Sequence, residues 1–279
     1  MASNSSIYAE FFGVSTPHIT FDVLPNTDPN IPFHFIVSSA VDSQGDGNFA
    51  AGWYPVFDAV TISNYKGRHL KPGSNTESQT KFILSITSPQ FKGIDGWTDK
   101  ATNSIINLIN QYNFDGIDIC FSSIDRSVTA QNFANRVAEL IRRLRQQRKI
   151  GIVSISPTPT LDVYYQSLYH NLHAQVDFVN YRFYGLPQIP VDLRTFREAI
   201  VRVKDVLYPG AKVLVGNKTN RQSNGKINDL IFFQAYAQVP GLHGIFGWAA
   251  DESPREFTFE RDALKALAQV QIPQPSIYF

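Results

Sequence analysis

Residues 114–122, Phe-Asp-Gly-Ile-Asp-Ile-Cys-Phe-Ser, hold the side chains whose types and spacing are most typical of a chemical site. The segment has the length and apolar content of a buried strand, and side chains alternate between the two faces of a strand. Alternation places Asp118, Cys120 and Ser122 on one face and the apolar residues between them on the other. A carboxylate on the inner face of a core strand is costly unless it is hydrogen-bonded. Asp118 therefore either anchors a buried polar network or belongs to an active site.

The elements that would position this segment are strand-length apolar runs separated by helical patterns. In residues 129–149, for example, apolar residues recur at steps of three and four. We expect strands at 7–12, 33–41, 81–87, 116–121, 151–156, 178–184, 212–216 and 244–248. We expect helices at 98–112, 129–149, 191–207, 228–236 and 259–270, and a loop over 45–75.

Strands that alternate with helices predict a parallel sheet. Eight such units in 279 residues predict one α/β domain over residues 1–279, a single-domain (β/α)8 TIM barrel. No Gly-rich phosphate loop follows the early strands, which disfavours a doubly wound dinucleotide-binding sheet. Functional residues of such barrels gather at the C-terminal ends of the strands, so we expect the site there.

The composition argues against several classes of function. The chain has 25 Lys plus Arg and 24 Asp plus Glu, a balance that disfavours binding to nucleic acid or to a membrane surface. The one cysteine, Cys120, excludes an internal disulfide and a multi-cysteine metal site. His170 and His173 are spaced as a pair on a helix, but no third ligand accompanies them. We therefore expect no metal and no cofactor. We also expect a monomeric chain.

Segments in order along the chain match motifs of a known enzyme family. They are Tyr-Ala-Glu-Phe-Phe-Gly at 8–13, Phe-His-Phe-Ile-Val-Ser-Ser-Ala-Val at 33–41, Lys-Phe-Ile-Leu-Ser-Ile at 81–86, Asp-Phe-Val-Asn-Tyr-Arg-Phe-Tyr at 177–184 and Gly-Ile-Phe-Gly-Trp at 244–248. Asp115-Gly-Ile-Asp118 resembles the start of the fourth-strand pattern D-x-x-D-x-D-x-E. Together, these segments and the fourth-strand match resemble glycoside hydrolase family 18, in particular its plant narbonin-like and chitinase-like members. The resemblance implies a TIM barrel in which Trp248 floors a sugar subsite.

The catalytic half of that fourth-strand pattern is missing. The resemblance implies that the final Glu of the pattern donates a proton to the leaving oxygen. It also implies that the preceding Asp orients the substrate's acetamido group, which attacks the anomeric carbon. These positions hold Ser122 and Cys120. A serine hydroxyl is no general acid near neutral pH, so we expect the degenerate motif Asp115, Asp118, Cys120 and Ser122 to leave no catalytic residue.

These departures predict a chitinase-like plant protein that has lost catalysis and serves as a storage protein or a carbohydrate-binding protein. A composition with one Cys, one Met and 34 Asn plus Gln favours storage. The alternative is a weak or altered endo-chitinase that hydrolyses β-1,4-linked N-acetylglucosamine polymers. In that case Asp42, Asp125, Asp251 or Glu252 would replace the missing acid. The partner we expect is chitin or N-acetylglucosamine oligosaccharides.

Four residues are candidates for contact with a sugar. Trp248, Tyr181 and Phe183 could form an aromatic platform, because the C–H face of a sugar ring is apolar. Asp42 ends the second expected strand and is the polar candidate.

The first six residues, Met-Ala-Ser-Asn-Ser-Ser, lack the basic and apolar segments of a secretory signal. We expect the cytoplasm or a storage compartment of a plant cell, or secretion if a leader was removed.

Overall fold

The computed structural model describes residues 6–15, 31–53, 57–68, 80–220 and 222–271. The strands are β1 (Ile7–Phe12), β2 (Phe33–Val41), β3 (Ala50–Ala51), β4 (Thr80–Thr87), β5 (Gly116–Ile119), β6 (Ile152–Ile155), β7 (Phe178–Tyr181), β8 (Val213–Lys218) and β9 (Gly244–Trp248). The α-helices are α1 (Ala59–Arg68), α2 (Trp97–Tyr112), α3 (Ala130–Gln146), α4 (Asp162–Leu172), α5 (Leu193–Arg202), α6 (Asp229–Gln238) and α7 (Thr258–Gln271).

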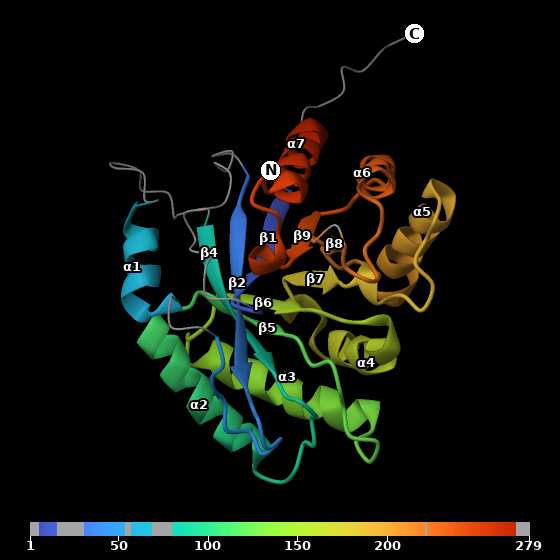
Figure 1. Ribbon diagram of the computed structural model, residues 1–279. Coiled ribbons are helices and arrows are strands. Elements are labelled where there is room, and N and C mark those ends of the chain that lie inside the picture. The colour runs from blue at the N-terminus through green and yellow to red at the C-terminus, as the bar shows by residue number, and fades with distance from the viewer. Residues whose placement is uncertain (1–5, 16–30, 54–56, 69–79, 221, 272–279) are drawn as a thin grey trace.

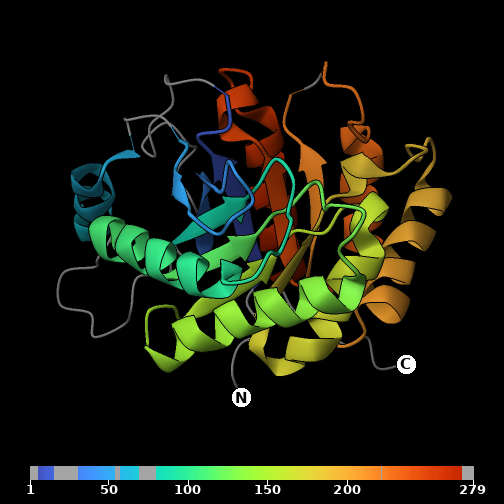
Figure 2. The same cartoon turned by 90° about the horizontal axis from the view of Figure 1, so that it is seen from below.

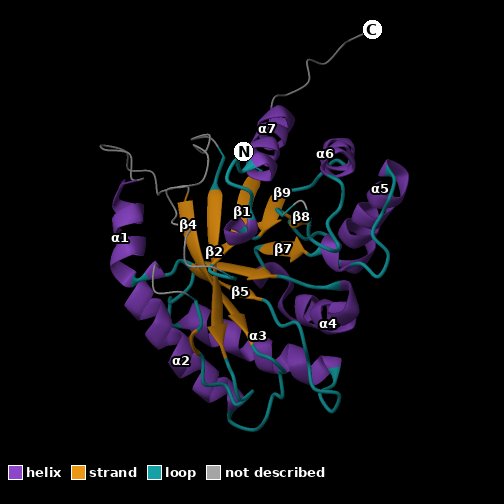
Figure 3. Cartoon of the chain, in the orientation of Figure 1, coloured by secondary structure: helices purple, strands orange, loops and turns teal. Residues whose placement is uncertain are grey.

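A closed parallel barrel lies at the centre of the molecule (Figure 1, Figure 3). Its strands pair in the order β1-β9-β8-β7-β6-β5-β4-β2, and β2 pairs with β1 to close the ring. The short β3 pairs antiparallel with the end of β2. Helices surround the barrel in the view from below (Figure 2). The expected α/β fold, a single-domain (β/α)8 TIM barrel, is confirmed.

Alternation along the strands sorts side chains into two layers. At β5, Cys120 belongs to a small apolar cluster inside the barrel. Ile117, Ile119 and Phe121 belong to the large cluster that also contains the buried helix residues. Asp118, two residues before Cys120, is fully buried. The predicted assignment of faces is therefore confirmed for this strand.

Two helices, α1 and α4, were not expected from the sequence. The loop predicted over 45–75 is wrong where α1 forms, because its β-branched, Asn and Gly residues are weak helix formers. Ile62 and Tyr65 of α1 are buried, so packing on the barrel stabilises this helix. In α4 the buried side chains are Tyr165, Leu168, Tyr169 and Leu172. They follow helical spacing, but tyrosines weaken the apolar pattern in the sequence.

Closure of the barrel depends on Gly244, which pairs with Ile7 where β9 meets β1. A Cβ atom at this position would lie 2.1 Å from the carbonyl oxygen of Ile7. We expect Gly244→Ala to lower the free energy of unfolding by about 1–3 kcal/mol, because the two strands must move apart.

Urea denaturation measures this loss, with Gly151→Ala as the matched control immediately before β6. A Cβ at Gly151 would meet the carbonyl oxygen of Asp115 at an ordinary 3.7 Å. The free energy of unfolding of Gly151→Ala should stay within about 0.5 kcal/mol of that of the wild type. An equal loss in both variants would contradict the role given to Gly244.

Candidate functional site

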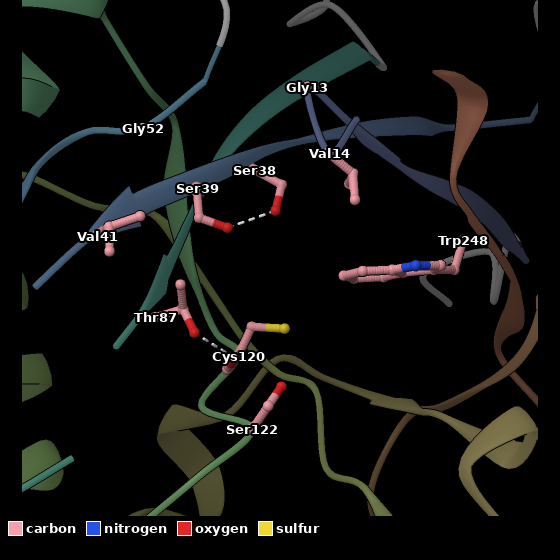
Figure 4. A pocket seen from close by; sticks show the side chains of 10 residues that line it. All are labelled: Gly13, Val14, Ser38, Ser39, Val41, Gly52, Thr87, Cys120, Ser122 and Trp248. Carbon is pink, nitrogen blue, oxygen red and sulfur yellow. Dashed lines mark hydrogen bonds between the residues drawn. The ribbon is translucent and has the colours of Figure 1, made fainter. Parts of the chain in front are cut away.

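A pocket of about 240 Å³ opens at the C-terminal ends of the strands (Figure 4). Its walls come from β2 and from the segments that end or follow β1, β3, β4, β5 and β9. The lining residues are Gly13, Val14, Ser38, Ser39, Val41, Gly52, Thr87, Cys120, Ser122 and Trp248. Their side chains supply hydroxyls, one thiol and one indole, and none of these ten residues carries a carboxylate.

Trp248 forms one wall of the pocket and its indole extends into the open space (Figure 4). The side chain is half-buried. Its ring packs on Phe11, with 4.7 Å between the centroids, and on Tyr184, with 6.2 Å between the centroids. The structure thus places Trp248 at the mouth of the barrel, where a flat apolar ring face is open to a ligand.

Cys120 and Ser122 lie across the pocket from Trp248, and their side chains point toward its centre (Figure 4). Burial raises the pKa of the Cys120 thiol to about 11, so the thiol is neutral at physiological pH. Ser122 is exposed, and its hydroxyl oxygen accepts a hydrogen bond from Nη1 of Arg182 at 3.1 Å. Neither side chain can supply a negative charge to the pocket.

Arg182, just after β7, brings a buried positive charge to this side of the pocket. Besides its bond to Ser122, its Nη2 donates to the carbonyl oxygen of Phe121 at 3.3 Å. Its Nε is buried without a hydrogen-bond partner in the described part of the chain. Arg182 is not among the site residues predicted from the sequence. Alternation could have found it, because Arg182 lies two residues beyond Asn180 and shares its face.

Asp118 anchors a polar network inside the barrel. Its Oδ1 accepts hydrogen bonds from Ser154 Oγ at 2.7 Å, Ser156 Oγ at 2.8 Å and Asn180 Nδ2 at 3.2 Å. Its Oδ2 accepts from Ser85 Oγ at 3.4 Å. The carboxyl group is fully buried and does not line the pocket. Of the two alternatives for Asp118, the structure supports the buried network.

Tyr181 and Phe183 lie on the outer side of the barrel wall, not in the pocket. Both are buried in the layer between strands and helices. The Tyr181 hydroxyl donates to Asp162 at 2.8 Å, and its ring packs on Phe183 with 4.7 Å between the centroids. The prediction that these two residues contact a sugar is wrong for this pocket. Alternation turns Tyr184 inward instead, against Trp248.

Asp42 is an anchor for the loop after β2. Its carboxylate is fully buried and accepts hydrogen bonds from the amides of Asp46 and Gly47 at 3.0 and 2.8 Å. Trp97 Nε1 also donates to it, at 3.0 Å. The prediction that Asp42 contacts the substrate is therefore wrong, because all three donors hold it away from the pocket.

The two acids after β9 differ in their surroundings. Asp251 accepts hydrogen bonds from the amides of Gly13 and Ser15 at 3.0 and 2.6 Å, and so it holds the segment that follows β1. Glu252 is half-buried, and burial raises its pKa. Neither residue lines the pocket.

The remaining acids named from the sequence hold local structure. Asp125 accepts hydrogen bonds from the amide and hydroxyl of Ser127 at 2.9 and 2.6 Å, which lowers its pKa. Asp115 lies before β5, at the end of the barrel away from the pocket. It accepts from the amide of Phe82 at 2.7 Å and pairs with Lys66 at 3.0 Å.

Within the described ranges, no three His, Cys, Asp or Glu side chains are grouped as metal ligands would be. His170 and His173 are both exposed, and His170 Nδ1 bonds the carbonyl oxygen of Gln166 at 2.7 Å. None of the described helices combines the length and apolar character that crossing a bilayer requires.

Comparison with known families matches residues 54–224 to glycosyl hydrolases family 18. The chain belongs to this family. It is 28% identical to Chitinase 1 of Tulipa saxatilis subsp. bakeri over 304 residues, which cover 99% of this chain and 92% of that protein. It is 24% identical to the RuBisCO-associated protein of Glycine max, covering 90% of this chain and 89% of that protein.

Solved structures of family 18 share the whole fold. The family 18 chitinase from Crocus vernus superposes with a TM-score of 0.84 at 25% identity, covering 96% of this chain and all of that one (100%). The catalytic domain of a family 18 chitinase from the fern Peteris ryukyuensis superposes with a TM-score of 0.81 at 24% identity, covering 94% of this chain and 99% of that one. The expected resemblance to plant chitinase-like proteins of family 18 is confirmed.

In this family 18 barrel, burial raises the pKa of Asp118 from 3.8 to about 6, although its hydrogen-bond donors oppose the shift. The native state therefore binds one more proton than the unfolded chain between these two values. The resulting stability is fully present below about pH 4 and is lost as the pH rises through 6. Relative to Asp118→Asn, we expect the wild type to lose about 2 kcal/mol of unfolding free energy between pH 4 and 7.

Denaturant titrations of both proteins at several pH values measure this difference. Asp192→Asn is the control, because hydrogen bonds from Thr195 lower the pKa of that exposed carboxyl instead. The difference in unfolding free energy between the wild type and Asp192→Asn, plotted against pH, should slope in the opposite direction. A flat difference curve for Asp118→Asn would show that burial does not shift this carboxyl.

Proposed function

We propose that this family 18 protein binds carbohydrate at the mouth of its barrel without hydrolysing it. One observation carries the proposal. Ser122 occupies the position for which the family resemblance implies a proton-donating Glu, and the hydroxyl of Ser122 accepts from the guanidinium of Arg182. A site that protonates a leaving oxygen needs a carboxyl group there with a raised pKa. This pocket has a hydroxyl and a cation in its place.

None of the residues that line the pocket substitutes for that acid. Cys120, at the position of the orienting Asp, is a neutral thiol because burial raises its pKa to about 11. Asp42 and Asp251 accept hydrogen bonds from backbone amides that hold loops in place. Both carboxylates are held by these loop amides, and neither residue lines the pocket.

Sugar binding is supported by Trp248, whose indole is open to the pocket (Figure 4). Hydroxyls from Ser38, Ser39 and Thr87 line the same pocket and can bond sugar hydroxyls. The tulip relative bears the name of a chitinase. We therefore propose chitin or N-acetylglucosamine oligosaccharides as the ligand class to test first.

Storage is the second candidate function. The near absence of sulfur amino acids and the 34 Asn and Gln residues favour a nitrogen reserve. The soybean relative is named for association with RuBisCO and not for an activity on chitin. A storage role requires no ligand, so absence of sugar binding would favour it.

Hydrolysis and binding are measured with the same N-acetylglucosamine oligomers. We expect no turnover above background between pH 4 and 8, and measurable binding that weakens at least about tenfold in Trp248→Ala, since the apolar ring face is lost. Val191→Ala, at an exposed apolar residue, is the control and should bind as the wild type does. Hydrolysis abolished by Glu252→Gln or Asp125→Asn would contradict the proposal and identify the acid.

Restoring the acid by one change should fail. Nη1 of Arg182 is 3.1 Å from the hydroxyl that Ser122→Glu would replace. An adjacent cation lowers the pKa of a carboxyl by about 1–3 units, whereas a general acid needs it raised. We expect no turnover from Ser122→Glu alone. The double variant Cys120→Asp with Ser122→Glu should show higher turnover than Ser122→Glu. Adding Arg182→Gln should raise the turnover further, because the cation beside the new carboxyl is removed.

Release of reducing ends from N-acetylglucosamine oligomers measures the turnover of these variants. Arg194→Gln added to the double variant is the control, since Arg194 is exposed and pairs with Glu198. Turnover by Ser122→Glu as fast as that of the triple variant would show that neither Cys120 nor Arg182 opposes catalysis.

A further inference from the structure

The barrel wall next to the pocket holds a guanidinium that forms no hydrogen bond or ion pair with a carboxylate among the described residues. Arg182 is 6% exposed, and its hydrogen-bond partners are a hydroxyl and a backbone carbonyl, both neutral. Its Nε has no partner among the described residues. Burying a charge without an ionic partner is expensive. Such a cation is a site at which an anion from outside would be favoured.

Ser122 connects this cation to the pocket. Its hydroxyl oxygen accepts the hydrogen bond from Arg182, so its own proton is available to another acceptor. Ser122 is exposed and lines the pocket. A donor polarised by a neighbouring cation binds an anionic acceptor more strongly than a neutral one.

A second unused donor lies close by on the inner side of the wall. The Tyr184 hydroxyl is buried without a partner in the described part of the chain. Its ring packs on Trp248, with 6.2 Å between the centroids. Lys218 lies 6.0 Å from the centroid of the same ring. Tyr184 therefore adds an unused donor on the Trp248 side of the pocket, where the Lys218 ammonium donates to Ser223 and to the carbonyl oxygen of Asn224.

Asp118 and Glu252 lie near enough to act on these groups through space, but among the described residues neither carboxylate forms a hydrogen bond or ion pair with Arg182, Tyr184 or Lys218. Asp118 is the carboxylate inside the barrel, and its oxygens accept from Ser85, Ser154, Ser156 and Asn180. Neither a hydrogen bond nor an ion pair joins it to Arg182 within the described ranges. The ten lining residues bring no carboxylate to the pocket.

We propose that the pocket selects an oligosaccharide that carries a carboxylate, such as a uronic acid. The carboxylate accepts from the Ser122 hydroxyl with the Arg182 guanidinium directly behind it, and the sugar ring lies against Trp248. The ligand thus brings the carboxylate that this chain lacks at Ser122. This inference rests on the proposed carbohydrate binding and narrows its ligand class.

Isothermal titration compares three probes: a galacturonic acid trisaccharide, its methyl ester and the N-acetylglucosamine trimer. The ester keeps the ring and removes the charge. We expect the acid to bind at least about tenfold more tightly than the ester in 50 mM salt, and this preference to disappear in Ser122→Ala and in Arg182→Gln. Trp248→Ala should weaken acid and ester by the same factor. Arg194→Gln, an exposed arginine of α5, should change neither.

The outcomes separate this inference from the proposed function. Equal binding of the acid and its ester would overturn the selection for a carboxylate and leave carbohydrate binding intact. Absence of binding by all three sugars would overturn both and favour storage. Acetate that competes as well as the acid trisaccharide would show an anion site without sugar selectivity. Thermal melts establish folding, and Ser122→Ala keeps the test decisive if Arg182→Gln does not fold.

Discussion

A polar side chain inside a closed parallel barrel must find its hydrogen-bond partners there, because the wall excludes water. Asp118 meets this constraint with donors from the next two strands, β6 and β7, among them Ser154 and Asn180. Arg182 lies nearer the mouth, and its Nε has no hydrogen-bond partner among the described residues. Both oxygens of the Asp118 carboxylate accept hydrogen bonds at the centre, whereas beside the pocket Arg182 Nε and the Tyr184 hydroxyl have no partner in the described part of the chain. A ligand can complete the hydrogen bonding only at the mouth.

The same constraint explains what the acids at the mouth do. Asp42 and Asp251 lie in loops, where backbone amides are not paired in a sheet and need acceptors. Each carboxylate bonds two such amides and thereby shapes a loop near the pocket. These two carboxylates therefore stabilise loops and are not placed to act as acids in the pocket. The pocket is left with hydroxyls, a neutral thiol and a cation behind them.

The sequence by itself determined the barrel and the inner face of β5. Strand length, helical spacing and two-residue alternation are local properties, so they could be recognised without any tertiary contact. They placed Asp118 and Cys120 inside the barrel and Trp248 at the end of β9, as the structure has them. Ser122 reaches the pocket from the loop beyond β5, which ends at Ile119. The local properties failed for α1, whose residues favour a helix only weakly and which forms because Ile62 and Tyr65 are buried against the barrel.

Only the tertiary structure decided which side chains reach the pocket. Asp42 turns away because Trp97, 55 residues later, donates to it. Arg182 reaches Ser122 across 60 residues of sequence. Tyr181 faces the helices, where its hydroxyl bonds Asp162 in α4, a helix that the sequence did not reveal. The partners of loop side chains are residues that the fold brings close in space. They can lie far away in the sequence, so the spacing of nearby residues does not predict them.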